Sequence, residues 1–451
     1  MFDVISGPTR AQGYAMRHGT TATAEIPAAP LVGQPIDPEV VEFREAFEAR
    51  STLDEIIREG ARKMLQTAIE TEVDDFVAHH ADRRDAHGKR LVVRNGYLPS
   101  RELLSGAGIL QVKQPRVRDN APTSEDRVFF APSVLPPYLR RSKSVDELIP
   151  WLYLKGISTG DFSEALSALL GKDAPNLSPN VVVRLKEKWS QEYEVWSRRD
   201  LSQKHYLYVW ADGIYVNVRL EDDANRRQCL LVLMGATSEG KKELIAVIDG
   251  YRESEQSWTE LLLNLQQRGL SEAPLLAVGD GALGFWAALR KVFGKTREQR
   301  CWVHKTANVL NKMPKSVQPK AKADLHEIWQ AETRHGANQA FDHFLEKYRA
   351  KYDAACDCLA KDRDVLLTFY DFPAEHWKHL RTTNPIESTF STIRLRHRRT
   401  KGSGTRRTSL AMMFKLAHSA EKRWRRLDGH EHIVPLLQGK LFIDGIMQDA
   451  A

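Results

Sequence analysis

The sequence has few cysteines and no long hydrophobic run. Four cysteines in 451 residues do not suggest a disulfide framework, so a reducing cytoplasm is the default compartment. The longest apolar stretches are strand-length, as from Cys229 to Ala236, which is too short to span a bilayer. Residues 1–20 lack a charged start followed by an apolar core, so we do not expect a signal peptide.

Acidic residues are scarce in one part of the chain. The net charge is only +7, but between Arg381 and Arg426 thirteen Arg and Lys residues stand against two acids, Glu387 and Glu421. Such a run is usually a solvated face. Its density, with aromatic residues and the flexible KGSG at 401–404 interleaved, favours a polyanion, nucleic acid above all. The candidate DNA contacts are Arg381, Asn384, Arg394, Arg396, Arg398, Arg399, Lys401, Arg406 and Arg407.

The N-terminal third of the chain divides into three parts. Residues 1–35 are rich in Ala, Gly, Pro and Thr and show no period, which predicts a flexible arm. Apolar residues recur at helical spacing from Phe43 to His80, and a basic, strand-like stretch with glycine turns follows. We therefore expect residues 36–140 to be helical with a small β part, and to serve in DNA binding or dimerisation.

Residues 141–200 contain three short helical patterns. Ser158 or Thr159 can cap the second helix, and Ser178 with Pro179 can begin the third. This close spacing is typical of a helix-turn-helix, whose last helix would enter the major groove of DNA. A plain packed helical subdomain fits the same pattern.

The period of the sequence changes at His205. Three strand patterns are followed by a helix, a strand at 273–281, a helix and a strand at 297–304. This is the order of an α/β RNase H-like catalytic core, a mixed sheet flanked by helices. We expect the first part of the core at 201–304, an all-helical insertion at 305–372, the rest of the core with a basic helix at 373–430, and a tail at 431–451.

Two aspartates end predicted strands of this core. Asp212 closes the first strand in VWADG, and Asp280 closes the fourth in AVGDG. An Asp before Gly is usually a turn residue, but the first and fourth strands of such a sheet are neighbours, so these ends would meet. Two carboxylates about 4 Å apart repel by roughly 4 kcal/mol at an effective dielectric near 20 unless a cation lies between them. Carboxylate oxygens favour Mg²⁺ or Mn²⁺.

Two Mg²⁺ or Mn²⁺ ions, as a two-metal mechanism uses, need a third acid to hold them, and Glu387 is the candidate. Local sequence offers a simpler interpretation, in which Asn384 is an N-cap, Pro385 takes the first helical position and Glu387 caps the helix start. The flanking basic residues favour the functional interpretation, since they could hold the DNA phosphates while the acid holds metal.

Several longer motifs carry a resemblance to a known family. ADGIYVNVR, GYRESEQSW, VGDGALGFW, QRCWVHK and HLRTTNPIESTFSTIRLR closely resemble the Mutator-like transposases of bacterial insertion sequences, over roughly Phe43 to Ile446. The resemblance implies that Asp212, Asp280 and Glu387 form the acidic, metal-binding triad of a DDE transposase. It also implies two Mg²⁺ or Mn²⁺ ions per site and a bacterial, nucleoid-associated protein.

The same resemblance implies cleavage at terminal inverted repeats and direct joining of the 3′ hydroxyl to target DNA, by at least a homodimer on double-stranded DNA. Whether a circular DNA intermediate forms stays open. Cys301 and His304 belong to the family signature and are expected near the active centre. An alternative assigns them, with Cys356 and Cys358, to a four-ligand zinc site. GYRESEQSW has no assigned role beyond leading from the third strand into a helix.

Three other functions compete with this interpretation. A tyrosine recombinase is disfavoured because no tyrosine follows Tyr370 to act as nucleophile. A nuclease on the same fold would cut DNA without joining it, and a repressor descended from a transposase would only bind. The intact acids Asp212, Asp280 and Glu387 argue against the repressor.

Overall fold

The computed structural model describes residues 38–157, 161–170, 179–222, 226–250, 252–281, 283–400 and 402–448. The predicted arm at 1–35, the capping residues Ser158, Thr159 and Ser178, and the predicted DNA contact Lys401 lie outside these ranges. Within them, no helix combines the length and apolar character that a membrane crossing would require.

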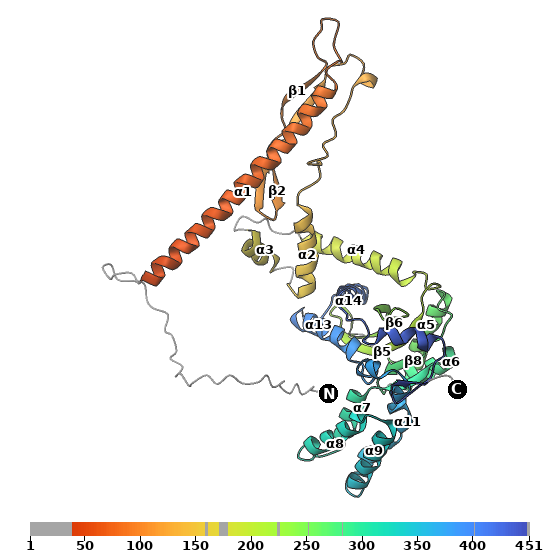
Figure 1. The fold of residues 1–451 in the computed structure, drawn as a ribbon. Coiled ribbons are helices and arrows are strands. Elements are labelled where there is room, and N and C mark those ends of the chain that lie inside the picture. Colours follow the sequence, from red (N-terminus) through yellow and green to blue (C-terminus); the bar gives the residue numbers. More distant parts are fainter. Residues whose placement is uncertain are drawn as a thin grey trace.

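A long helix, α1 (Pro38–His79), projects away from the body of the molecule with a small β module alongside it (Figure 1). Buried Ile69 of this helix packs with Leu103 and Val112 of the β module. Both the helix and the strand-like stretch were predicted, and both predictions are confirmed. The strands form two antiparallel pairs, β1 with β4 and β2 with β3, at Val92–Tyr97, Arg101–Ser105, Gly108–Val112 and Pro115–Asp119.

Three helices connect α1 and the β module to the body. Their shared apolar core includes Ile149, Leu152, Phe162 and Leu166. The three predicted helices are thus confirmed, whereas the helix-turn-helix assignment stays a prediction. The helices are α2 (Lys143–Lys155), α3 (Phe162–Leu170) and α4 (Pro179–Ser197).

The body is built on a mixed five-stranded sheet with the strand order β7-β6-β5-β8-β9. Strands β5, β6 and β7 are antiparallel neighbours, while β8 and β9 continue the sheet in parallel with β5. The prediction that the first and fourth strands are adjacent is confirmed. The bounds are β5 (Tyr206–Asn217), β6 (Arg227–Thr237), β7 (Lys242–Gly250), β8 (Leu276–Gly279) and β9 (Arg297–Arg300).

Two predicted strand ends were wrong. Strand β5 does not stop at Asp212 but runs on to Asn217, because β6 pairs with it along its whole length, up to Arg227. The last strand was expected to extend to residue 304. It ends at Arg300, because Cys301 is the N-cap of the next helix.

Alternating side chains of β5 enter two different cores. Trp210 and Ile214 belong to the larger core, which includes residues of the helical insertion and of the C-terminal helices. Val209 and Ala211 belong to the second core, under α5 (Glu255–Gln267) and α6 (Leu283–Val292). Because side chains alternate along a strand, Asp212 lies on the face of the larger core.

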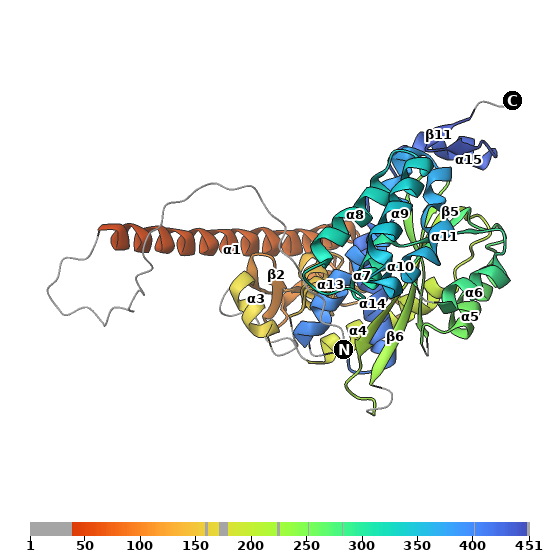
Figure 2. The same ribbon diagram turned by 90° about the horizontal axis from the view of Figure 1, so that it is seen from below.

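The segment predicted as an all-helical insertion consists of helices, which lie at the lower end of the molecule in Figure 1 and face the viewer in Figure 2. Its helices are α7 (Trp302–Leu310), α8 (Gln318–Gln330), α9 (Arg334–Arg349), α10 (Asp353–Ala360) and α11 (Arg363–Leu366). The later elements are α12 (Trp377–Leu380), α13 (Asn384–Thr400), α14 (Arg406–Glu421), α15 (Ile433–Leu437) and a small hairpin, β10 (Phe442–Ile443) with β11 (Ile446–Met447). Short 3₁₀ helices occur at Ser124–Asp126, Thr368–Asp371, Ala374–His376 and His430–His432.

Candidate active site

Asp212 is a nearly buried carboxylate in the middle strand of the sheet. The residue is 8% exposed, and its Oδ1 accepts a hydrogen bond of 2.8 Å from the backbone N–H of Gly213. The pairing of β5 with β8 ends one residue earlier, at Ala211 and Gly279. Burial, followed by the charge of Asp280, raises the pKa of Asp212 to about 7.

Asp280 directly follows β8, as predicted. Its backbone is held in place because the indole N–H of Trp286 donates a hydrogen bond of 2.9 Å to its carbonyl oxygen. The neighbouring carbonyl of Gly279 accepts a bond of 2.8 Å from the N–H of Cys301. The aspartate therefore lies at the carboxyl end of a parallel strand, beside the segment that leads from β9 into α7.

Glu387 lies in the first turn of α13, one position later than predicted. The carbonyl of Thr383 accepts bonds from the N–H groups of Ile386 and Glu387, so Thr383 takes the N-cap position expected for Asn384. The hydroxyl of Thr383, a fully buried residue, donates a bond of 2.7 Å to Oε1 of Glu387. This contact fixes the direction of the Glu387 carboxylate at the start of its own helix.

Cys301 and His304 lie beside Glu387. The Cys301 thiol sulfur is 3.3 Å from both the N–H and the hydroxyl of Thr383, and Nδ1 of His304 is 3.8 Å from Oε1 of Glu387. Burial alone would lower the pKa of His304, but its hydrogen bond with Cys301 and the charges of Cys301, Glu387 and Asp212 raise it to about 9. His304 is therefore a cation at neutral pH.

Within the described ranges, Cys301, His304 and Glu387 are the residues whose possible metal-ligand atoms all lie within 4.8 Å of one another. Asp212, Asp280 and Glu387 do not form such a group, so at least two of these acids are further apart. They are linked electrostatically instead. The charges of Asp280 and His304 shift the pKa of Asp212, and the charge of Glu387 shifts the pKa of His304. The four-ligand zinc alternative does not form: Cys356 is fully buried in the insertion, its thiol 4.0 Å from the carbonyl oxygen of Leu345.

Glu253 is an acid of this site that the sequence analysis missed. Burial, followed by the charge of Asp280, raises the pKa of its carboxyl to about 7, and its charge in turn acts on Asp212. The available signal was topological. Strands β5, β7 and β8 run in the same direction, so the residues after β7 emerge at the same edge of the sheet as Asp280.

Several predicted DNA contacts are engaged within the protein. The guanidinium of Arg381 lies over three aromatic rings, the nearest being Phe369 at 4.6 Å, while Arg396 is 3% exposed and lies 4.6 Å from the centre of the Tyr153 ring. Arg406 pairs with Asp249 at 2.6 Å. Arg407 pairs with acids of α4, although it is itself exposed.

The remaining predicted contacts of α13 that the structure describes face solvent. Asn384, Arg394 and Arg398 are all exposed, and Arg394 lies 5.9 Å from the centre of the Phe390 ring. The side chain of Arg399 is outside the described part of the chain, as is Lys401. The exposed face of α13 thus keeps part of the predicted basic surface, while the buried arginines contribute to packing.

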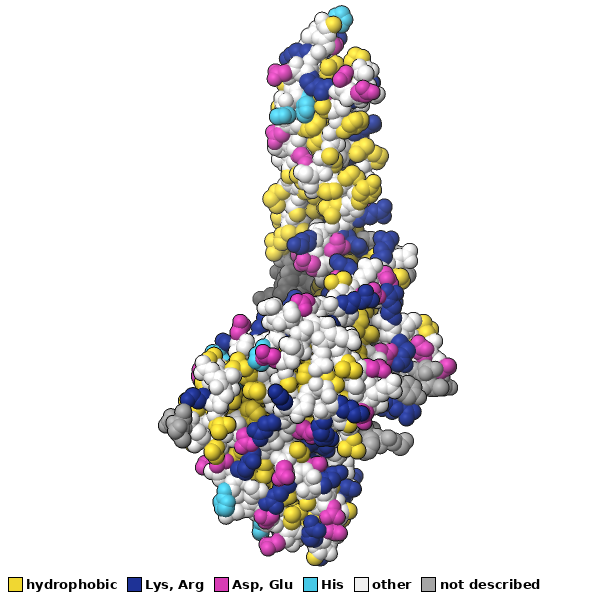
Figure 3. All heavy atoms as spheres, turned by 90° about the vertical axis from the view of Figure 1, so that its right-hand side faces the viewer, with side chains coloured by type: hydrophobic (Ala, Val, Ile, Leu, Met, Phe, Trp, Pro, Cys, Tyr) yellow, Lys and Arg dark blue, Asp and Glu magenta, His cyan; other side chains and the backbone are white. Residues whose placement is uncertain are grey.

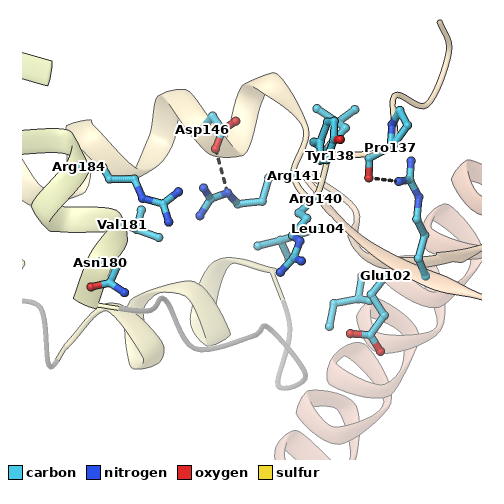
Figure 4. Close-up of a pocket in the computed structure, with 13 residues that line it drawn as sticks. Glu102, Leu104, Pro137, Tyr138, Arg140, Arg141, Asp146, Asn180, Val181 and Arg184 are labelled. Carbon is cyan, nitrogen blue, oxygen red and sulfur yellow. Dashed lines mark hydrogen bonds and ion pairs between the residues drawn. The ribbon is translucent and has the colours of Figure 1, made fainter. Parts of the chain in front are cut away.

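Lys and Arg side chains form a second basic region at the place where α1 and the β module join the body (Figure 3). A cleft of about 1020 Å³ lies there between the β module and helices α2 and α4. Figure 4 shows that Arg140 and Arg141, from the segment just before α2, and Arg184, from α4, reach into this cleft. Arg141 pairs with Asp146 at 2.9 Å, whereas exposed Arg140 and Arg184 have no ion-pair partner among the described residues.

Comparison with known proteins places these features in context. The family model described as "Transposase, Mutator family" matches residues 38–426. The chain is 54% identical to the transposase for insertion sequence element IST2 of Acidithiobacillus ferrooxidans over 283 residues, which are 63% of this chain and 95% of that protein. It is 49% identical to the transposase for element IS6120 of Mycolicibacterium smegmatis over 302 residues, covering 67% and 92% of the two chains.

Proposed function

Because the chain belongs to the Mutator family of transposases, which act for insertion sequences, we propose that it is a DDE transposase with an RNase H-like core. It binds the terminal inverted repeats, cleaves DNA at the ends of the element and joins each 3′ hydroxyl to another DNA site. The observation that carries this proposal is the position of Asp212 and Asp280 directly after the last paired residues of β5 and β8, where the charge of Asp280 helps to raise the pKa of Asp212.

The acids fit divalent cations. Asp212 is nearly buried, is raised in pKa by the charge of Asp280, and accepts its one described hydrogen bond from its neighbour's N–H. Like charges held together in this way favour a bound cation, and carboxylate oxygens select Mg²⁺ or Mn²⁺. Asp212, Asp280 and Glu387 would hold two such ions. When bound, they would activate the attacking oxygen and stabilise the leaving 3′ oxygen.

The protein's own residues position these acids. Gly213 donates to Asp212, Trp286 fixes the backbone of Asp280, and Thr383 directs Glu387. Cationic His304 lies beside Glu387, where it could attract a DNA phosphate. Because two element ends must be joined in one event, we also propose that the active form on DNA is at least a homodimer.

Purified protein, Mg²⁺ and labelled element ends test the proposed reaction. Joined products are expected, because Asp212, Asp280 and Glu387 are all present to hold the proposed metal ions. Nicked but unjoined DNA would identify a nuclease of the same fold, and DNA that is bound but never cut would identify a repressor. Either of these two outcomes would overturn the proposal.

We propose that the cleft that contains Arg140, Arg141 and Arg184, here called the arginine cleft, holds the phosphate backbone of the terminal repeat. Replacing Arg140 and Arg184 together by Ala should weaken binding and lower the slope of log affinity against log salt by about 1 to 2, since each lost phosphate contact contributes about 0.9. Fluorescence anisotropy with labelled repeat DNA measures both quantities. Arg349→Ala, a change to an exposed arginine of α9, is the control and should leave the slope unaltered. An unchanged slope in the double variant would exclude the cleft.

The raised pKa of Asp212 predicts how stability depends on pH without metal. Its pKa of about 7 in the folded protein exceeds the unfolded value near 4, so the folded state binds the extra proton. Stability should therefore fall as pH rises from about 4 to 7, by about 2–4 kcal/mol relative to Asp212→Asn. Melting temperatures in EDTA at pH 5 and pH 8 measure this, and Mn²⁺ should restore the wild-type protein at pH 8. Parallel pH profiles for the two proteins would contradict the prediction.

A further inference from the structure

We infer that Cys301, His304 and Glu387 form a second metal site, one for a thiophilic divalent ion such as Zn²⁺, and that an ion held there inhibits the protein. The inhibition rests on the proposed function, because the ion would occupy Glu387, the third acid of the proposed Mg²⁺ centre. The site differs from the four-ligand zinc alternative, since a carboxylate replaces the two cysteines of the helical insertion.

The first observation is the convergence of three different donor atoms. The sulfur of Cys301, a ring nitrogen of His304 and a carboxylate oxygen of Glu387 all lie within 4.8 Å of one another. Nδ1 of His304 is 3.8 Å from Oε1 of Glu387. Nitrogen and oxygen ligands about 2.0–2.2 Å from a tetrahedral zinc ion lie roughly 3.4 Å apart, so this pair needs to close only slightly around the ion.

The second observation is how the chain presents these ligands. Cys301 is the N-cap of α7, and His304 follows three positions later in the first turn. Side chains three positions apart lie on the same face of a helix, so both point the same way. The N–H of Trp302 donates a bond of 2.9 Å to the carbonyl of Arg381, which ties the start of α7 to the segment before α13 and Glu387. The ligands are therefore brought together by backbone structure.

The third observation is the position of Thr383, a fully buried residue. Its hydroxyl lies 2.7 Å from Oε1 of Glu387, 3.3 Å from the Cys301 sulfur and 3.5 Å from Nδ1 of His304. Its backbone N–H also donates to the sulfur at 3.3 Å. Such contacts behind the ligands orient them and stabilise a thiolate. The side chains of His304 and Glu387 are 36% and 27% exposed, which leaves the other side of the three donors open to an entering ion.

The donor set selects the ion. A thiolate, an imidazole and one carboxylate suit zinc, whereas Mg²⁺ takes oxygen ligands. Within the described part of the chain, Glu387 is grouped with the thiol and the imidazole, and not with both Asp212 and Asp280. A zinc ion would hold Glu387 in this arrangement, and its binding would displace the protons of the Cys301 thiol and of His304 into the solvent.

Cobalt(II) supplies a direct test, because it takes the ligands that zinc takes and absorbs light when a thiolate binds it. Full-length protein freed of metal is titrated with Co²⁺ at pH 8, and the thiolate-to-cobalt charge-transfer band is followed in the near ultraviolet. The wild-type protein should show this band. Zn²⁺ should abolish it by displacing Co²⁺, and a large excess of Mg²⁺ should leave it in place.

Two cysteine variants form a matched pair, with circular dichroism to check that each is folded. Cys301→Ser should lose the band and bind Zn²⁺ at least about 100-fold more weakly, since even a group behind a ligand contributes roughly 10–100-fold. Cys358→Ser changes the partly exposed cysteine of the insertion and should keep the band. Glu387→Gln leaves the buried thiol untouched and gives a second test, because it should bind Co²⁺ at least about tenfold more weakly.

Absence of the band in the wild-type protein would overturn the inference, as would an unchanged band in Cys301→Ser or wild-type Co²⁺ affinity in Glu387→Gln. In the joining assay with Mg²⁺, Zn²⁺ should stop the wild-type protein, and Cys301→Ser should tolerate at least about tenfold more Zn²⁺. The Co²⁺ readout needs no DNA. If the band forms but no DNA is joined, the proposed function falls alone, and if joining continues with the site filled by Zn²⁺, the inhibition falls.

Discussion

We expect Asp280→Asn to slow cleavage and joining of element ends by at least about 10³-fold, equivalent to about 4 kcal/mol of activation free energy. The amide keeps the shape of the side chain but removes the charge that would hold a divalent ion. The backbone contacts of this residue, including the bond from Trp286, do not depend on the carboxylate. Single-turnover joining with a labelled, pre-cut end in Mg²⁺ measures the effect.

The Asp280→Asn variant should still bind terminal-repeat DNA with wild-type affinity, because the arginine cleft lies on other elements. Asp200→Asn provides the control: Asp200 accepts hydrogen bonds from Ser202 and lies before the sheet, so its loss should leave joining intact. Joining by Asp280→Asn within tenfold of the wild-type rate would remove this residue from the proposed triad.

The second large effect is expected at the junction of the sheet and the helical insertion. Asp362 pairs with Lys305 of α7, which is 2% exposed, and lies 3.4 Å from Arg300 at the end of β9. Asp362→Ala would leave the Lys305 charge buried without its counter-charge, so we expect a loss of about 3–5 kcal/mol in unfolding free energy. Urea unfolding followed by circular dichroism measures it.

Asp357→Ala is the matched control for this prediction. Asp357 lies on the neighbouring helix α10 and pairs with Arg349, but both side chains are about half exposed or more. Exposed pairs contribute roughly 0–1 kcal/mol, so this variant should unfold almost as wild type does. Equal losses in the two variants would show that Lys305 tolerates its burial without Asp362.

The sequence predicted the parts of the fold that depend on local pattern. The succession of strands and helices, the helical segment after β9 and the position of Asp280 followed from periodicity and from glycine punctuation, and the adjacency of the first and fourth strands followed from the expected fold. The length of β5 did not, because it depends on how far β6 pairs with it. The N-cap of α13 was placed one residue late for a related reason: besides its local bond to Glu387, Thr383 contacts Cys301, which is distant in sequence.

The site itself was predictable only in part. Motif positions singled out Asp212, Asp280 and Glu387, whereas Glu253 depends on which strands share an edge of the sheet. Basic residues were the hardest to assign. Nothing in the local sequence separates Arg381, which lies among aromatic rings, from Arg394, which faces solvent, because burial of an arginine depends on side chains brought from elsewhere.

The position of the insertion has a consequence for how the protein matures. Asp212 and Asp280 are translated before Glu387, and helices α7 to α11 lie between Asp280 and Glu387 along the chain. A chain interrupted within these helices would carry the arginine cleft and two of the three acids but could not complete the centre. Under the proposed function, premature termination would therefore yield a product that binds element ends without cutting them and competes with the full-length protein.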